Sequence, residues 1–292
     1  MPDRKYQISG SSASHPSGRS GPTCCVVIPI YRESPLKTEC ASLERAAQTL
    51  ADRRIIFVTH EELNPAEYLR ILKPYGVQFE FAYFPKYYFA GISGYNALMY
   101  APRFYERFLD YDYILLYQLD SWVFSPNLDH WLSLDYDYLG GPWFEEIKHT
   151  MTLKWSGCFN GGLCLRKTAV FYRLCFDRII QLNKRFWELQ EQRRMMRFGA
   201  AKIFSFFKMF LLKAVNKLFK SEIGNEDVIW TRLLKQKGKL PSLEEALEFC
   251  FADFYAEYAF ELNKRALPSF CHDWDGIWPW KFWQNYITAA PA

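Results

Sequence analysis

Hydrophobic residues in the first half of the chain follow strand-like and helix-like patterns in turn. Residues 23–30, 54–59 and 77–84 are short apolar runs rich in β-branched and aromatic side chains, which is typical of strands. Between them, residues 36–51 and 65–72 place apolar side chains at helical spacing. This order of strand, helix, strand, helix, strand predicts a parallel sheet of the doubly wound type.

A central strand is predicted at Tyr113–Tyr117, after a helix from Ser93 to about Phe108. The strand is apolar at every position, which is typical of a strand covered by helices on both faces. Gln118 and Asp120 follow it directly, at the edge where open α/β sheets bind ligands. A carboxylate there can hold a divalent cation, and the cation a phosphate. Alternatively, Asp120 only caps the next turn.

The second half of the chain is less regular. Predicted strands cover residues 136–140, 158–166 and 252–260, predicted helices cover 168–182, 224–236 and 243–248, and 144–156 is expected to be a loop. We therefore expect one α/β domain over residues 23–283. A flexible Ser/Gly/Pro-rich tail is expected at residues 1–22, and a short C-terminal tail at 284–292.

Residues 186–221 are predicted to form a helical insertion with a basic, amphipathic character. Its part from 193 to 220 contains eight Lys or Arg and no acid. Because the whole chain has a net charge of +4, the rest of the chain has a net charge of −4. A mildly acidic body excludes a broad nucleic-acid surface. With Lys on one side and Phe and Leu on the other, this segment is typical of a helix lying on a membrane surface. A helix packed on the domain with solvated lysines fits the pattern as well.

The eight cysteines include no C-x-x-C pair, and several lie in apolar runs where Cys is a small buried side chain. This favours a reducing cytosol over zinc or a disulfide framework. Residues 1–22 contain no apolar signal region, and no uncharged run is long enough to span a bilayer. We expect a cytoplasmic protein, soluble or peripheral on the inner face of the cell membrane.

Three D-x-D patterns occur away from the predicted ligand edge or late in the chain. They are Asp110/Asp112, Asp135/Asp137 and Asp273/Asp275. The first two precede strands and so lie at the opposite edge of the sheet. Asp120 alone follows a buried strand, with Gln118 in the partner position, and we predict that it contacts the ligand bound at this edge.

Three further groups have both a chemical and a structural interpretation. Asn160–Gly162 can expose an amide and backbone to a sugar, or form a bulge in a strand. Glu226 and Asp227 begin a predicted helix, where acids are favoured by the helix dipole with or without chemistry. His272 lies among acids in a late segment, as a metal ligand or an ordinary polar residue.

Taken in order, these segments resemble an uncharacterised bacterial domain family classed as glycosyltransferase-like. The matching segments are residues 26–33, 94–99, 113–124, 138–143, 160–167, 225–230 and 271–274. They cover most of residues 23–283. That family in turn is similar to the GT-A fold of nucleotide-sugar transferases, which implies a Rossmann-like mixed sheet flanked by helices.

The resemblance also implies roles for individual residues. The implied donor-binding residues are Pro29, Tyr31, Arg32, Glu33, Asn96, Gln118, Asp120, Asn160, Gly161 and Gly162. Asp120 is similar to the last acid of the family's D-x-D, and His272 resembles a late histidine that completes a metal site for Mn²⁺ or Mg²⁺. Glu226-Asp227 is similar to the Glu-Asp pair of inverting members, with Asp227 as the base. The departure is Gln118, an amide where the first Asp is expected.

We therefore predict an inverting glycosyltransferase that moves a sugar from a nucleotide-sugar donor to an acceptor hydroxyl. A glycan or lipid-linked acceptor in surface glycan or glycolipid assembly would suit a membrane role for residues 193–220. One alternative is a non-catalytic carbohydrate- or nucleotide-binding module, which the loss of the first acid favours. The other is a glycoside hydrolase using Glu226 and Asp227, although neighbouring helical residues do not face each other.

Overall fold

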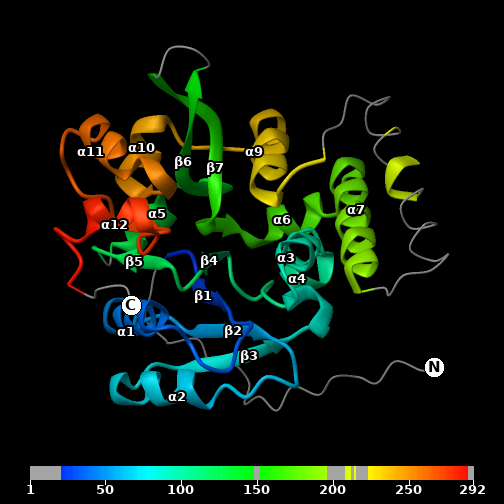
Figure 1. Ribbon diagram of the computed structural model, residues 1–292, viewed down its shortest axis with the longest axis horizontal. Helices are drawn as coiled ribbons and strands as arrows, with labels where there is room; N and C mark the ends of the chain where they lie inside the picture. The colour runs from blue at the N-terminus through cyan, green and yellow to red at the C-terminus, as the bar shows by residue number, and fades with distance from the viewer. Residues whose placement is uncertain are drawn as a thin grey trace.

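The computed structural model describes residues 21–125, 127–147, 152–195, 208–211, 214 and 223–288. Its centre is a six-stranded mixed sheet with helices on both faces, and a smaller three-stranded sheet packs beside it (Figure 1). This confirms the predicted fold class, a mixed α/β sheet flanked by helices.

The first half of the chain builds four parallel strands. Its elements are β1 (Cys24–Pro29), α1 (Lys37–Thr49), β2 (Ile55–Thr59), α2 (Ala66–Leu72), η1 (Lys73–Tyr75), β3 (Phe79–Tyr83), η2 (Lys86–Phe89), α3 (Ile92–Met99), α4 (Pro102–Glu106) and β4 (Tyr113–Tyr117). In the sheet these strands lie in the order β3-β2-β1-β4. All of them pair in parallel, as the alternation of strands and helices predicted.

The second half adds two long strands and the smaller sheet. Its elements are β5 (Ser121–Val123), α5 (Leu128–Ser133), β6 (Tyr138–Ile147), β7 (Thr152–Lys167), α6 (Thr168–Leu174), α7 (Arg178–Met195), α9 (Glu226–Lys237), α10 (Leu243–Phe249), β8 (Cys250–Phe251), η3 (Asp253–Tyr255), α11 (Ala256–Leu262), β9 (Phe270–His272) and α12 (Ile277–Trp283). Strand β7 runs antiparallel to both β4 and β6. The smaller sheet has the order β5-β9-β8.

Alternate side chains of the central strands enter two different hydrophobic cores. Leu115 of β4 packs into a core with α1, α2 and α5, whereas Leu116 packs into a core with α3, α4, α6 and α9. Every residue of β1 and β4 is buried, which explains why these strands are apolar at every position. A third core joins the smaller sheet to α10, α11 and α12 around Trp274 and Trp283.

Residues 144–147 and 152–156 form paired strands instead of part of the predicted loop. Strand β6 continues to Ile147 and β7 begins at Thr152, with Phe144 paired to Trp155. Glu145 and Lys154 are directly opposite each other and form an ion pair of 3.0 Å. The described part of this segment therefore belongs to the more exposed ends of β6 and β7.

Two predicted helices are each divided in two. The helix expected from Ser93 to Phe108 is interrupted before Pro102, because a proline forces the preceding residue out of helical geometry; Ala101 has φ −82° and ψ 126°. The helix expected at 168–182 stops at Leu174. Helix α7 then begins beside Asp177, whose side chain accepts a hydrogen bond from the Ile179 amide.

The strand predicted at residues 252–260 is wrong, because this segment forms η3 and α11. Ala256 and Ala259 are the buried positions, and their spacing of three fits a helix rather than a strand.

The basic insertion predicted at residues 186–221 lies only partly within the described residues. Its first ten residues belong to α7, and residues 208–211 are helical. The rest, with most of its lysines, lies outside the described residues, so the membrane role remains a prediction. Among the helices that the structure describes, none has the length and apolarity to cross a bilayer.

Candidate functional site

The candidate site lies where the chain changes direction across the sheet. From β1 the chain moves outward through β2 and β3, and β4 then returns to the other side of β1 (Figure 1). The carboxyl ends of β1 and β4 therefore border a topological switch point, where open α/β sheets bind ligands. The segment after Pro29 and the segment after Tyr117 both start there.

Asp120 and Gln118, at the end of β4, both face His272. Nε2 of His272 lies 3.2 Å from Oδ1 of Asp120 and 3.1 Å from Oε1 of Gln118. The strand pairing explains this contact, since Ser121 of β5 is directly opposite His272 of β9. The amide of Trp274 also donates to the Asp120 carbonyl at 3.3 Å, and the fully buried Trp274 side chain holds this segment in the third core.

Asp120 is an anion in this arrangement. Burial opposes its ionisation, but the nearby His272 charge and hydrogen bond prevail and lower the pKa of Asp120 below its usual value. A negative carboxylate oxygen and an amide oxygen thus both lie within 3.2 Å of the same imidazole nitrogen. One imidazole nitrogen carries at most one hydrogen, so it cannot donate fully to both oxygens.

These three groups could bind a divalent cation, although they supply only a few of the ligands that it needs. Asp120 and His272 supply ligands of the kinds that Mg²⁺ and Mn²⁺ accept, and Gln118 adds a carbonyl oxygen. No cluster of three or more His, Cys, Asp or Glu suited to a metal occurs among the described residues. A cation held here would therefore need further oxygen ligands, such as those of a diphosphate and water.

Residues Asn160–Gly162 form a bulge in β7. Between the pairs Gly140–Cys164 and Pro142–Phe159, β6 advances two residues and β7 advances five. The bulge interpretation is therefore confirmed, and it does not exclude the chemical one. Oδ1 of Asn160 accepts from the Gly162 amide at 2.7 Å, and the Gly162 carbonyl accepts from the Gln118 amide at 2.9 Å.

The two glycines let side chains from other elements reach the bulge. A Cβ at Gly162 would lie 1.9 Å from Nε2 of His272, and one at Gly161 would lie 2.3 Å from Oε1 of Glu226. No side chain fits at either position. The bulge therefore separates two parts of the site, with Gly162 next to His272 and Gly161 next to Glu226 and Asp227.

Glu226 is held in the protein by Arg166. Nη2 of Arg166 donates to Oε1 of Glu226 at 2.7 Å, and both side chains are buried. Arg166 also donates to the Tyr105 hydroxyl at 2.8 Å. Burial raises the pKa of Glu226 to about 7, which outweighs the lowering by Arg166, and Asp227 adds to the increase.

Asp227 lies in the first turn of α9, beside Glu226. Its side chain is largely buried, and its Oδ1 accepts from the Val228 amide at 2.7 Å, so it satisfies one of the free amides at the helix start. Asp227 therefore does cap the start of α9, as the structural interpretation predicted. Oδ1 of Asn96 accepts from the Glu226 amide at 2.6 Å, so Asn96 anchors α9 to α3.

The segment after β1 presents exposed side chains at the switch point. Tyr31 and Glu33 are exposed, and the Arg32 guanidinium donates to the Tyr31 hydroxyl at 2.9 Å and lies over its ring at 4.7 Å. The Arg32 carbonyl accepts from the Tyr68 hydroxyl at 2.9 Å, which fixes the loop to α2.

The other D-x-D acids have structural partners. Asp112 accepts from the Thr23 amide and hydroxyl at 2.8 and 2.9 Å, and Asp135 forms an ion pair of 2.6 Å with Lys167. Both lie at the amino end of β4 or the adjoining end of β7, opposite the switch point. Asp273, in contrast, directly follows His272.

Arg166 and Trp274 are the residues of this site that the sequence analysis did not select. Arg166 was visible as a cation within the apolar run 163–166, two residues after Cys164 on the same side of β7. A charge in a buried strand requires a buried partner. Trp274 could not be distinguished from the nine other tryptophans by sequence alone.

Comparison with known families assigns the chain to one of them. The profile of a family described as "Protein of unknown function (DUF5672)" matches residues 78–272, which is more than half of the chain. The chain belongs to this family, and the matched region extends from before β3 to His272. A comparison with curated proteins gives no match.

Solved glycosyltransferase structures show a distant likeness. The bifunctional glycosyltransferase WbbM in its apo form is 10% identical, with a TM-score of 0.43 over 86% of this chain and 45% of that one. GlyE of Streptococcus pneumoniae TIGR4 is 14% identical, with a TM-score of 0.44 over 91% of this chain and 60% of that one. A glycosyltransferase involved in glycosylation of the PBCV-1 major capsid is 11% identical, with a TM-score of 0.32 over 86% and 92%. The chain thus spans about half of the first two.

Proposed function

We propose that the protein is a glycosyltransferase that moves a sugar from a nucleotide-sugar donor to an acceptor hydroxyl. The observation that carries the proposal is the meeting of Asp120, Gln118 and His272 at the switch point of the sheet. The sequence resemblance described above supplies the reaction class, and the second pair of acids, Glu226 and Asp227, supplies a candidate base.

The donor's diphosphate would lie against Asp120 and His272, with its nucleotide toward Pro29–Glu33. If a cation is bound, Asp120 and His272 hold it, with Gln118 as an additional oxygen, and the cation supplies charge neutralisation of the diphosphate. The His272 imidazole can itself donate a hydrogen bond to a departing phosphate. Tyr31, Arg32 and Glu33 would then contact the nucleotide, and Asn160, Gly161 and Gly162 the sugar.

The transfer we propose is a single displacement with inversion. Asp227 accepts the proton of the acceptor hydroxyl while the hydroxyl oxygen forms a bond to the anomeric carbon of the donor sugar. The bond from that carbon to the diphosphate oxygen breaks, and the electron pair leaves with the nucleoside diphosphate. Glu226, bound to Arg166, would orient the first turn of α9 rather than take the proton itself.

The test is release of nucleoside diphosphate from a panel of nucleotide sugars, with and without Mn²⁺. We expect wild type to turn over one donor and Asp120→Asn to lose at least about 100-fold in rate, since it removes the negative charge that lies 3.2 Å from Nε2 of His272. The matched control is Asp110→Asn, an exposed acid of a D-x-D at the opposite end of β4, which should retain wild-type activity.

The same panel separates this proposal from a binding module. A module would show a donor-induced rise in melting temperature without release of nucleoside diphosphate, and Gln118 in place of an acid favours that second candidate. Absence of both turnover and thermal stabilisation for every donor would contradict the transferase. A glycoside hydrolase is disfavoured because Glu226 is buried against Arg166.

A further inference from the structure

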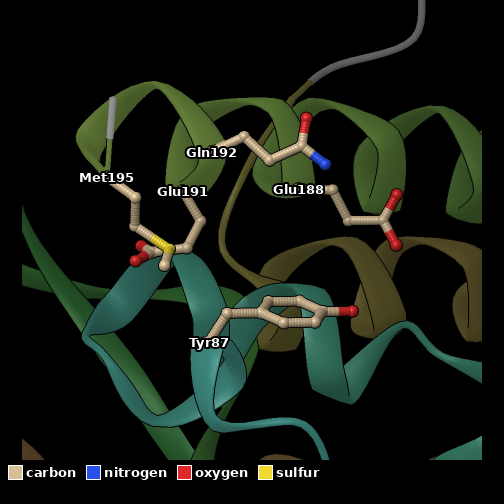
Figure 2. Close-up of a pocket in the computed structure, with 5 residues that line it drawn as sticks. All are labelled: Tyr87, Glu188, Glu191, Gln192 and Met195. Atoms are coloured by element: carbon tan, nitrogen blue, oxygen red, sulfur yellow. The ribbon is translucent and has the colours of Figure 1, made fainter. Parts of the chain in front are cut away.

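A cavity of about 330 Å³ lies between η2 and α7, and its lining residues include none of the acids of the candidate site. Tyr87 of η2 forms one wall, and Glu188, Glu191, Gln192 and Met195 of α7 form the other (Figure 2). Ligand-binding pockets usually have volumes of about 300–1,000 Å³, so this one suits a single small ligand.

The carboxylates of this pocket are already neutralised by basic side chains. Arg194 donates to both oxygens of Glu191 at 2.8–3.1 Å, and Lys184 forms an ion pair of 2.9 Å with Glu188. Arg194 also donates to the Ala90 carbonyl at 2.7 Å, which joins α7 to the segment after η2. A cationic ligand would have to displace these partners, so a neutral polar ligand fits the pocket better.

The lining of the pocket combines a flat aromatic ring with hydrogen-bonding groups. Figure 2 shows the Tyr87 ring on one side, with the Gln192 amide and the Glu188 carboxylate on the facing helix. The Met195 side chain adds apolar surface at the other end. A pyranose ring has this same division, with C–H groups on its face and hydroxyls around its edge, and the Gln192 amide can both donate to and accept from them.

Helix α7 also connects this pocket to the start of α9. Asn183 accepts from the Gly224 amide at 3.1 Å, and Trp187 donates to the Gly224 carbonyl at 3.0 Å. Gly224 is two residues before Glu226. Glu191 is one helical turn beyond Trp187, about 6 Å along α7. The pocket and the proposed base are thus positioned by the same helix.

From these observations we propose that the α7–η2 pocket binds one neutral sugar residue of the acceptor. It would hold a sugar next to the one that receives the transferred group, and so select the acceptor. The assignment of this sugar to the acceptor rests on the proposed transferase function. The binding of a neutral sugar to the pocket can be measured without any turnover.

The direct test is saturation-transfer NMR with the full chain and individual sugars. The probes are glucose, galactose, mannose and N-acetylglucosamine, with glucuronate as a charged comparison and uridine as a nucleoside. We expect at least one neutral sugar to bind, and Gln192→Ala to weaken it about 3- to 10-fold through loss of one or two hydrogen bonds. Tyr87→Ala should abolish binding.

The matched control is Gln190→Ala, the same change on the same helix at a residue that does not line the pocket. It should bind the sugar as wild type does. The inference is overturned if no neutral sugar binds, if Gln192→Ala and Gln190→Ala bind equally, or if uridine competes for this pocket more strongly than any sugar. Gln192 is exposed, so its variant should fold normally.

Nucleoside diphosphate release to water tests the transferase separately. Sugar binding that depends on Gln192 supports the pocket even where no donor is hydrolysed, and in that case only the transferase fails. Donor hydrolysis without sugar binding has the opposite meaning: the transferase stands and the pocket is overturned.

Discussion

At the scale of single residues, the most consequential group is the buried pair of Arg166 and Glu226. Taking a carboxylate out of water is costly, and one arginine offsets only part of that cost here, so the pKa of Glu226 lies near 7. The protonation of Glu226 therefore changes within the neutral range, next to the residue that we propose as base.

This shift predicts a pH-dependent stability that one substitution removes. Between about pH 4.5 and 7, folded Glu226 holds a proton that the unfolded chain has lost, so the free energy of unfolding decreases as pH rises through this range. The decrease should amount to about 3 kcal/mol at most. Glu226→Gln should remove it while still accepting a hydrogen bond from Arg166.

Urea unfolding of wild type and Glu226→Gln at pH 4.5, 6 and 8 measures this difference directly. The other carboxylates titrate in both proteins and cancel from the comparison. A gap between the two proteins that is constant across these pH values would contradict a raised pKa for Glu226.

At the scale of elements, the bulge in β7 is the part that organises the site. Its glycines are visible in the sequence, where they fit both a bulge and a contact with a sugar. The contacts that require them, with His272 and with Glu226, come from residues more than 60 positions later. Local patterns could not show those contacts, because they arise from the pairing of β5 with β9 and from the packing of α9 on β7.

The bulge also predicts a severe effect of a single added methyl group. Gly162→Ala would place Cβ 1.9 Å from Nε2 of His272, so the ring must move away from Asp120. We expect a loss of about 1–3 kcal/mol in stability, typical of an overpacked position, together with loss of donor-induced stabilisation in a thermal melt.

Gly224→Ala is the control for that prediction. A Cβ there would meet only the Ile229 side chain, at an ordinary 3.4 Å, although Gly224 lies just two residues before Glu226. Equal effects of both substitutions on donor binding would show that the contact with His272 is not what matters.

For the whole molecule, the four parallel strands with their helices and the later helices α9 and α10 were predictable, whereas the segment after α10 was not. The first half repeats one strand-and-helix unit, so apolar periodicity identifies it. The segment after α10 consists of short elements rich in aromatic residues, and the mistaken strand at 252–260 lies there. Its structure depends on a third core of tryptophans that joins distant segments.

That third core predicts a long-range effect of one tryptophan. Trp283 is fully buried against Phe124 and Phe251, so Trp283→Ala should lower stability by about 3–5 kcal/mol. Because β5 and β9 border this core, donor binding should weaken as well.

Trp278→Ala is the matched control, since Trp278 lies on the same helix and is 65% exposed. It should change stability by less than about 0.5 kcal/mol. Differential scanning calorimetry of the two variants, with and without a donor, makes the comparison. Similar melting temperatures for both would contradict the role given to the third core.

The pairing of His272 with Gln118 and Asp120 has a consequence for the order of events during synthesis. His272 follows Gln118 by 154 residues, which at typical elongation rates is about 8–30 s of translation. The parallel strands and the acid at their edge leave the ribosome well before the imidazole is made. A nascent chain can therefore possess most of its sheet while the donor site that we propose is still incomplete, and any binding that requires His272 comes only with the last part of the chain.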